Sequence, residues 1–111
     1  MSEAEREHLC RCLAETSAAT LADYRRLDSR LHLAIAEVTG SPSLTSATAD
    51  VRMRLNELLD AIPLLERNIQ HSNDQHQAIV DAILAGDPEV ARRAMQEHLS
   101  GTAALLRAFL A

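Results

Sequence analysis

The stretch Gly86-Asp87-Pro88 constrains this chain most, because it separates two long segments that have helical periodicity. A glycine can take the left-handed conformation that ends a helix, an aspartate can cap the next helix, and proline is tolerated at the first helical position. His76 lies eleven residues before Asp87, and His98 lies eleven residues after it. In an antiparallel helical hairpin both imidazoles would lie about 16 Å from the turn. We therefore expect a hairpin in which the two histidines face each other.

Apolar residues follow one face of each arm of this predicted hairpin. They recur every three or four residues, which is the spacing of a helix face that packs against a core. On the two arms they are Ile79, Val80, Ile83 and Leu84, and Val90, Ala91, Ala94, Met95 and Leu99. Because both histidines lie on or beside these faces, we expect them to be buried. Two imidazoles at one height inside a helical bundle suggest a metal site.

The rest of the chain is poor in turn residues and in aromatic residues. Three glycines and three prolines occur among 111 residues, and aromatic residues make up 2% against 47% for hydrophobic residues. Such a composition is typical of an all-α protein. The length fits one domain with a single core. We therefore predict an antiparallel bundle of about five helices that spans residues 1–111.

Capping spacings and breaking residues predict the helix boundaries. Ser-x-x-Glu, Thr-x-x-Asp and Ser-x-x-Gln patterns indicate helix starts, and Gly and Pro indicate helix ends. The predicted caps are Ser2, Thr20, Ser43, Ser72 and Asp87, and the first four helices are predicted to end near Thr16, Thr39, Ile62 and Ala85. Residues 64–71 are either a helical extension or a connection, with His71 in a loop. The last helix either continues through Gly101 or kinks there.

The predicted helix at 44–62 contains an apolar face and two arginines. Its apolar residues, which we expect to face inward, are Ala47, Val51, Leu55, Leu58, Leu59 and Ile62. Arg52 and Arg54 lie in the middle of this helix, and arginine side chains are mostly exposed in folded proteins. On this pattern alone we expect both arginines at the solvated surface.

Asp28 interrupts the apolar face of the predicted second helix. Burying a carboxylate without a partner is costly, so either a cation meets Asp28 or the helix turns it toward water. His32 follows four residues later, which places both side chains on one helix face, where they can share a cation. With His76 and His98, the chain offers one carboxylate and three imidazoles from three helices. Such a set of ligands suits Zn, Ni, Fe, Mn or Co.

Charge and cysteine content indicate whether the chain binds DNA and in which cellular compartment it is expected. The formal net charge of −5 argues that this chain alone does not bind DNA, because affinity for nucleic acid depends largely on basic residues that neutralise phosphates. Cys10 and Cys12 point in different directions on a helix, cannot easily form a disulfide, and favour a reducing cytoplasm. We find no apolar run that approaches a membrane span and no signal-peptide character at the start.

Two segments resemble the FCD-type C-terminal domain of FadR-subfamily GntR transcription regulators. The first is D-S-R-L-H-L-A-I-A-E-V-T-G-S-P-S-L, with Asp28 and His32, and the second is H-Q-A-I-V-D-A-I-L-A-G-D-P-E-V-A-R-R-A-M-Q-E-H-L, with His76 and His98. The D-x3-H and H-x21-H spacings, together with A-I-x2-G-D, are the specific elements. The resemblance covers about residues 22–106. It implies an antiparallel α-helical domain that binds a small effector, often a carboxylate, and helps regulators to form dimers.

The resemblance also implies site residues. In the metal-containing branch of the family, the ligands carry over to Asp28, His32, His76 and His98, with Zn, Ni or Mn as the metal. An effector carboxylate can complete the coordination, and an arginine from the helix after the Gly-Pro turn commonly helps to hold it. Arg52 or Arg54 is the candidate for that arginine.

The sequence departs from the family pattern in three places. Leu31 stands where the family usually has Phe, and Gly40-Ser41 stands where it usually has Gly-Asn. The winged helix-turn-helix domain and the usual first helix of the domain are expected to be missing, so the chain is expected to be N-terminally incomplete and to reach DNA only through a winged-helix domain that it lacks. An apolar face would then be exposed or buried in a homodimer, or the reading frame is partial.

The leading hypothesis is a non-enzymatic, effector-sensing and dimerisation domain in which a metal helps to bind a small organic acid. A metal-dependent hydrolase-like enzyme is one alternative, but it needs a general base, and Asp74 and Glu97 are expected to point away from the metal. A metal-free helical oligomerisation module with structural histidines is the other alternative.

Overall fold

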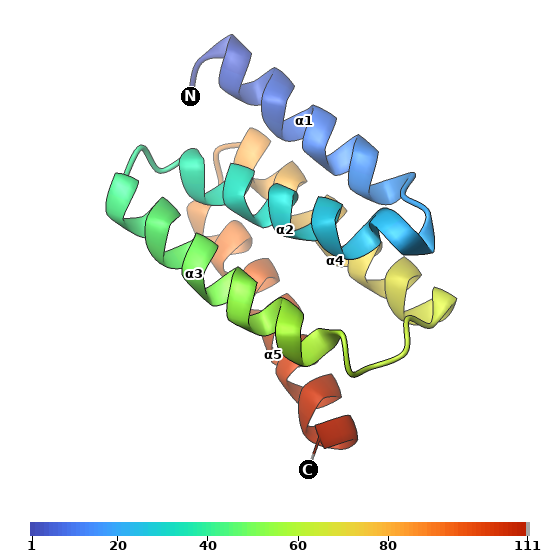
Figure 1. The fold of residues 1–111 in the computed structure, drawn as a ribbon. Helices are drawn as coiled ribbons and strands as arrows, with labels where there is room; N and C mark the ends of the chain where they lie inside the picture. The colour runs from blue at the N-terminus through green and yellow to red at the C-terminus, as the bar shows by residue number, and fades with distance from the viewer. Residues whose placement is uncertain (111) are drawn as a thin grey trace. The chain divides into compact units, whose positions relative to one another are not determined.

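The computed structural model describes residues 1–110, in which α-helices are joined by short loops (Figure 1). The helices are α1 (Glu3–Ser17), α2 (Leu21–Glu37), α3 (Pro42–Leu59), α4 (Glu66–Leu84) and α5 (Pro88–Leu110). No strand occurs in this described part of the chain, so the all-α prediction is confirmed. Within the same residues, no helix combines the length and the apolar character that crossing a membrane requires.

The described chain divides into two compact units, with the boundary between Glu57 and Leu58. In the first unit α1 packs along α2, and in the second α4 packs along α5. Figure 1 shows each of these pairs as two helices joined by a tight connection.

The N-terminal end of the first unit follows the predicted capping pattern. The Glu5 N–H donates to Ser2 Oγ over 3.1 Å, and the Ser2 N–H donates to Glu5 Oε2 over 2.8 Å, which together form a capping box. At the other end of α1, the Thr16 hydroxyl lies 2.7 Å from the Cys12 carbonyl oxygen and 3.1 Å from that of Leu27. This hydroxyl links the end of α1 to α2. The largest buried apolar side chains of the unit are Leu9, Leu13, Tyr24 and Leu31.

Helix α3 corrects two predictions. It begins at Pro42 after Ser41, whose hydroxyl accepts from the Leu44 N–H over 3.2 Å, so Ser43 is not the cap. Three of the residues expected to face inward, Ala47, Val51 and Leu58, are exposed, whereas Leu59 and Ile62 are buried as predicted. The buried and half-buried positions that recur every three or four residues are Thr45, Thr48, Arg52, Asn56 and Leu59. The polar side chains of Arg52 and Asn56 bind α2, and those contacts outweigh the apolar pattern.

Helix α4 begins seven residues before the predicted start. It starts at Glu66, and its N-cap Leu65 makes no side-chain cap hydrogen bond. His71 therefore lies inside a helix, although its side chain is exposed, and the loop prediction for it was wrong. Ser72 lies inside the helix and not at its N-cap. Most of the segment 64–71 therefore belongs to α4, which begins at Glu66.

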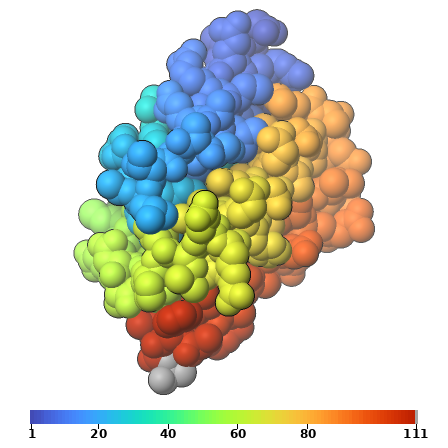
Figure 2. Space-filling view, turned by 90° about the vertical axis from the view of Figure 1, so that its right-hand side faces the viewer, coloured from blue at the N-terminus to red at the C-terminus, as the bar shows by residue number. Residues whose placement is uncertain are grey.

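In the turn between α4 and α5, Gly86 ends one helix and Asp87 caps the next, as predicted. Gly86 has φ +72°, the Asp87 N–H donates to the Ala82 carbonyl over 3.0 Å, and the Gly86 N–H donates to that of Ile83 over 3.1 Å. This pair of bonds is a Schellman motif. Asp87 Oδ1 then accepts from the Val90 N–H over 3.2 Å and caps α5. Side chains of α4 (yellow) and α5 (orange) adjoin each other in Figure 2.

Helix α5 runs past Gly101 to Leu110, as the first of the two open alternatives expected. Its apolar face is only partly buried. Val90 is 41% exposed and Leu99 is 48% exposed, so the prediction that both belong to a buried stripe was wrong. On the facing helix, Ile79 and Val80 are buried as predicted.

Candidate metal centre

Asp28 and His32 form a buried pair on α2. Asp28 is 6% exposed and His32 is 5% exposed. His32 Nε2 lies 3.5 Å from Asp28 Oδ1. Two ligands bound tetrahedrally to one zinc ion at about 2.0–2.2 Å lie roughly 3.4 Å apart. The two atoms are therefore spaced as a pair of ligands for a single transition-metal ion.

The other oxygen of Asp28 is bound by an arginine. Arg52 Nη2 donates to Asp28 Oδ2 over 2.7 Å, and Arg52 is only 7% exposed. The prediction of a solvated surface position was therefore wrong for Arg52, whereas Arg54 is exposed. The guanidinium lies on the buried face of α3 because a buried carboxylate on α2 needs a counter-ion.

This ion pair decides between the two outcomes that the sequence left open for Asp28. A cation meets the carboxylate, and that cation is the Arg52 guanidinium. The burial of Asp28 consequently needs no metal to explain it. The features that indicate a metal are instead the position of His32 and the facing imidazoles of the second unit.

His76 and His98 form the corresponding pair in the second unit. They lie on α4 and α5, are 0% and 5% exposed, and their ring centroids are 4.6 Å apart with an interplanar angle of 69°. A nitrogen of one ring lies within 4.8 Å of a nitrogen of the other. The sequence prediction that these histidines face each other and are buried is confirmed. The mirror spacing about Asp87 was a reliable signal because the hairpin is regular on both sides of the turn.

Gln75 orients one of these imidazoles. Its Oε1 lies 2.7 Å from His98 Nδ1 and accepts a hydrogen bond from it. Such a bond fixes the tautomer in which Nε2 has the lone pair needed for metal ligation. The capping pattern assigned Gln75 to a helix cap, so the sequence analysis missed this role. Its position one residue before His76 was the available signal.

Two further polar side chains at the site were also missed. Arg52 Nε lies 3.3 Å from Ser29 Oγ, and Asn56 Nδ2 lies 2.8 Å from the same hydroxyl oxygen. Ser29 directly follows Asp28, and Asn56 lies one turn after Arg52 on α3. Ser29, which is itself bound by Asn56, holds the Arg52 guanidinium beside the Asp28 carboxylate.

The cysteines are poor candidates for additional ligands. Cys10 is exposed, and Cys12 is buried on the opposite side of α1. Burial, the largest cause, raises the pKa of the Cys12 thiol, which disfavours the thiolate that a metal requires. The acidic residues considered as general bases, Asp74 and Glu97, are both exposed.

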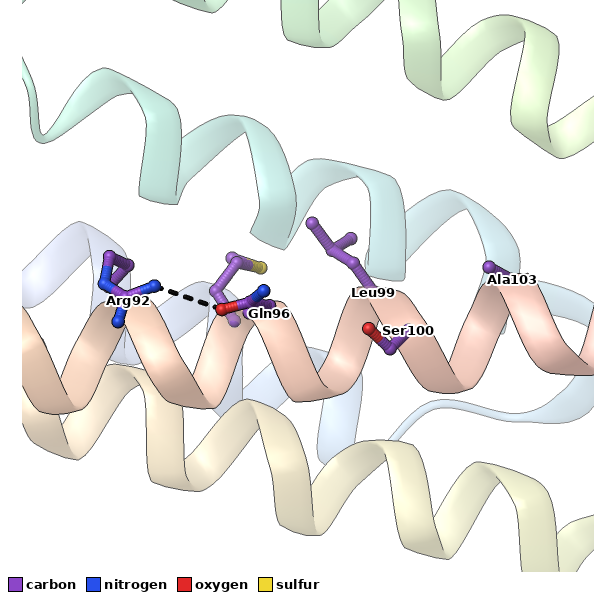
Figure 3. Close-up of a pocket in the computed structure, with 6 residues that line it drawn as sticks. Arg92, Gln96, Leu99, Ser100 and Ala103 are labelled. Atoms are coloured by element: carbon purple, nitrogen blue, oxygen red, sulfur yellow. Dashed lines mark hydrogen bonds between the residues drawn. The ribbon is translucent and has the colours of Figure 1, made fainter.

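A shallow depression of about 530 Å³ lies along one face of α5. It is lined by Arg92, Met95, Gln96, Leu99, Ser100 and Ala103. Figure 3 shows these side chains rising from one helix, with Arg92 bound to Gln96 over 3.1 Å. None of the predicted site residues lines it.

An all-α chain that buries a carboxylate and imidazoles on its helices has the features of a helical ligand-binding domain. The comparison with protein families makes the assignment specific. A family model described as the FCD domain matches residues 1–101, and the chain belongs to that family.

Curated relatives of this chain are described as transcription regulators. The HTH-type transcriptional repressor NanR of Cronobacter sakazakii is 37% identical over 95 residues, which cover 83% of this chain and 36% of that protein. The repressor of the same name from Escherichia coli K12 is 34% identical over 93 residues, with 79% and 34% covered. The putative L-lactate dehydrogenase operon regulatory protein of Escherichia coli K12 is 34% identical over 87 residues, with 66% and 30% covered.

This chain spans about a third of the length of the curated relatives it matches. No solved structure matches it.

Proposed function

We propose that this chain is the effector-sensing and dimerisation domain of a GntR-type transcription regulator that acts in the cytoplasm. The family match over residues 1–101 and the regulators among its relatives support this role. The formal net charge of −5 makes this chain itself a poor binder of DNA phosphates. DNA would instead be bound by a winged-helix domain of the regulator. A sensing role fits better than catalysis, because the relatives of this chain are described as transcription regulators.

We propose further that Asp28, His32, His76 and His98 bind one divalent transition metal, with Zn, Ni or Mn as candidates. The observation that carries this proposal is the 3.5 Å spacing between Asp28 Oδ1 and His32 Nε2 on a buried helix face. The facing pair of imidazoles on α4 and α5 supports it. The proposal requires both pairs to bind the same ion.

A small organic acid is the proposed effector. One effector oxygen would complete the coordination of the metal, and the Arg52 guanidinium would bind the carboxylate by charge-assisted hydrogen bonds. Arg52 is preferred over Arg54 because it is buried beside Asp28. Effector binding would then favour one packing of the helices and reposition the attached DNA-binding domains through the dimer.

Metal analysis of two histidine variants on the same helix tests the proposed ligand set. His76→Ala is expected to remove most of the bound metal, because His76 is a proposed ligand. His71→Ala, whose side chain on α4 is exposed, is expected to retain it. The measurement is metal per chain by elemental analysis after purification without chelators. Equal metal content in the two variants, or none in the wild type, would contradict the proposal.

A titration with small organic acids tests the effector. Calorimetry with and without a chelator is expected to show binding only when the metal is present. Binding of equal strength without metal would exclude a metal-assisted effector site.

A further inference from the structure

The two oxygens of Asp28 have different partners. Oδ1 lies 3.5 Å from His32 Nε2, and Oδ2 lies 2.7 Å from Arg52 Nη2. A metal that uses Asp28 and His32 as ligands would therefore approach the carboxylate at Oδ1. The guanidinium would remain at Oδ2, a few ångströms away.

The guanidinium is held firmly in this position. Its Nε lies 3.3 Å from Ser29 Oγ, and Asn56 Nδ2 lies 2.8 Å from the same oxygen. The side chains of Asp28 and Arg52 are each 8% exposed, so water screens the pair poorly. Arg52 cannot swing into solvent without breaking these contacts.

We infer that Arg52 is a resident counter-ion of Asp28 that opposes metal binding until an anion neutralises it. This inference rests on the proposed metal site. A divalent ion at Oδ1 would lie close to a fixed positive charge, in surroundings where charges interact more strongly than in water. Metal binding must overcome that repulsion.

The same arrangement couples the metal to the effector. Arg52 Nη1 makes no hydrogen bond to any of residues 1–110, so this nitrogen can donate to an incoming carboxylate. An anion bound there would offset the guanidinium charge and raise the affinity for the metal. Thermodynamic reciprocity requires the metal to raise the affinity for the anion by the same factor. Arg52 thus makes the response of the domain depend on both ligands.

The experiment measures the dissociation constant for Zn²⁺ alone by competition with a chromophoric chelator. Arg52→Gln removes the charge and is expected to bind zinc about ten-fold more tightly than the wild type. Arg52→Lys keeps the charge and is expected to remain near the wild-type affinity. Arg54→Gln removes an exposed charge two residues away and is the matched control, with no change expected.

Folding is checked by circular dichroism, and Arg52→Met is a second neutral variant that fills the same buried space. A wild type that binds zinc while the neutral Arg52 variants bind it equally or more weakly would overturn the inference and leave the proposed metal site intact. A wild type and a neutral variant that both fail to bind zinc would instead overturn the metal site itself. Zinc binding that appears only after Arg52 is neutralised would support the inference.

A second arm adds sodium acetate as the anion. The wild type is expected to bind zinc more tightly in acetate, and the gain is expected to be smaller in Arg52→Gln. An equal gain in both would show that acetate acts without Arg52 and would contradict the coupling.

Discussion

Asp28 and Arg52 can both be buried because each neutralises the charge of the other. Each side chain is 8% exposed, so removing one partner leaves the other as an uncompensated buried charge. Replacing both by apolar residues of similar size is often nearly neutral. Losing one member of the pair is therefore expected to lower the free energy of unfolding more than losing both.

A double-mutant cycle measures this penalty. Asp28→Ala is expected to lower the free energy of unfolding by about 3 kcal/mol, because it leaves the guanidinium buried without a counter-ion. Adding Arg52→Met is expected to restore part of that loss. The measurement is urea denaturation of the two single variants and the double variant. Additive losses would mean that the two side chains do not interact in solution.

The buried positions of His32, His76 and His98 were predictable from the sequence, whereas the burial of Arg52 was not. Asp28 and His32 interrupt an apolar stripe at a spacing of four, and the two hairpin histidines are symmetric about a clear turn. Arg52 lies on a helix whose apolar residues follow a different face, so periodicity placed it in solvent. Only a partner on another helix, which a local pattern does not show, explains its burial.

Among the helical elements, the α4–α5 hairpin depends most on backbone conformation. Gly86 has φ +72° at the end of α4, and nothing lies within 4 Å of the position where a Cβ would be added. The cost of a side chain there is therefore conformational and not steric crowding by neighbours. Gly101 lies in the middle of α5, where glycine has no such role.

Two alanine substitutions with opposite expected effects test this difference. Gly86→Ala is expected to destabilise the protein by about 1–2 kcal/mol, because it forces an L-residue into the left-handed region. Gly101→Ala is expected to stabilise it by up to about 1 kcal/mol, since an added Cβ would meet only Gln75 Nε2 at 4.0 Å. Thermal unfolding measures both. Destabilisation of similar size in the two variants would show that the left-handed position is not what makes Gly86 necessary.

Element boundaries were predictable where a local signal was unique. The capping box at Ser2 and the Gly86-Asp87-Pro88 turn are such signals. The start of α4 was not, because a Ser-x-x-Gln spacing also occurs by chance inside a helix. Gln75 instead forms a hydrogen bond with His98. The spacing of residues on one helix cannot indicate such a contact between helices.

At the scale of the whole molecule, the four proposed metal ligands are divided between the two compact units of the chain. Two of these ligands lie before residue 57 and two after residue 58. A ligand that binds only the folded state stabilises every part of the chain that must be folded to bind it. The metal would thus make the unfolding of the two units cooperative.

Unfolding with and without zinc tests this linkage. Zinc at a hundred times its dissociation constant is expected to add about 2.7 kcal/mol to the free energy of unfolding. Hydrogen exchange is expected to slow in both α2 and α4, and His76→Ala is expected to abolish the effect. Protection confined to one unit would show that the ion binds to that unit alone.

The hydrogen bond between Gln75 and His98 has a final consequence for how the hairpin behaves. Gln75 and His76 are consecutive on α4, so one helix supplies an imidazole and also the acceptor that sets the proton on the imidazole opposite. Sliding α5 along α4 by a single residue would separate these partners and remove the hydrogen bond that selects the tautomer of His98. A shift in the axial register of the two helices would therefore also change how well His98 serves as the proposed metal ligand.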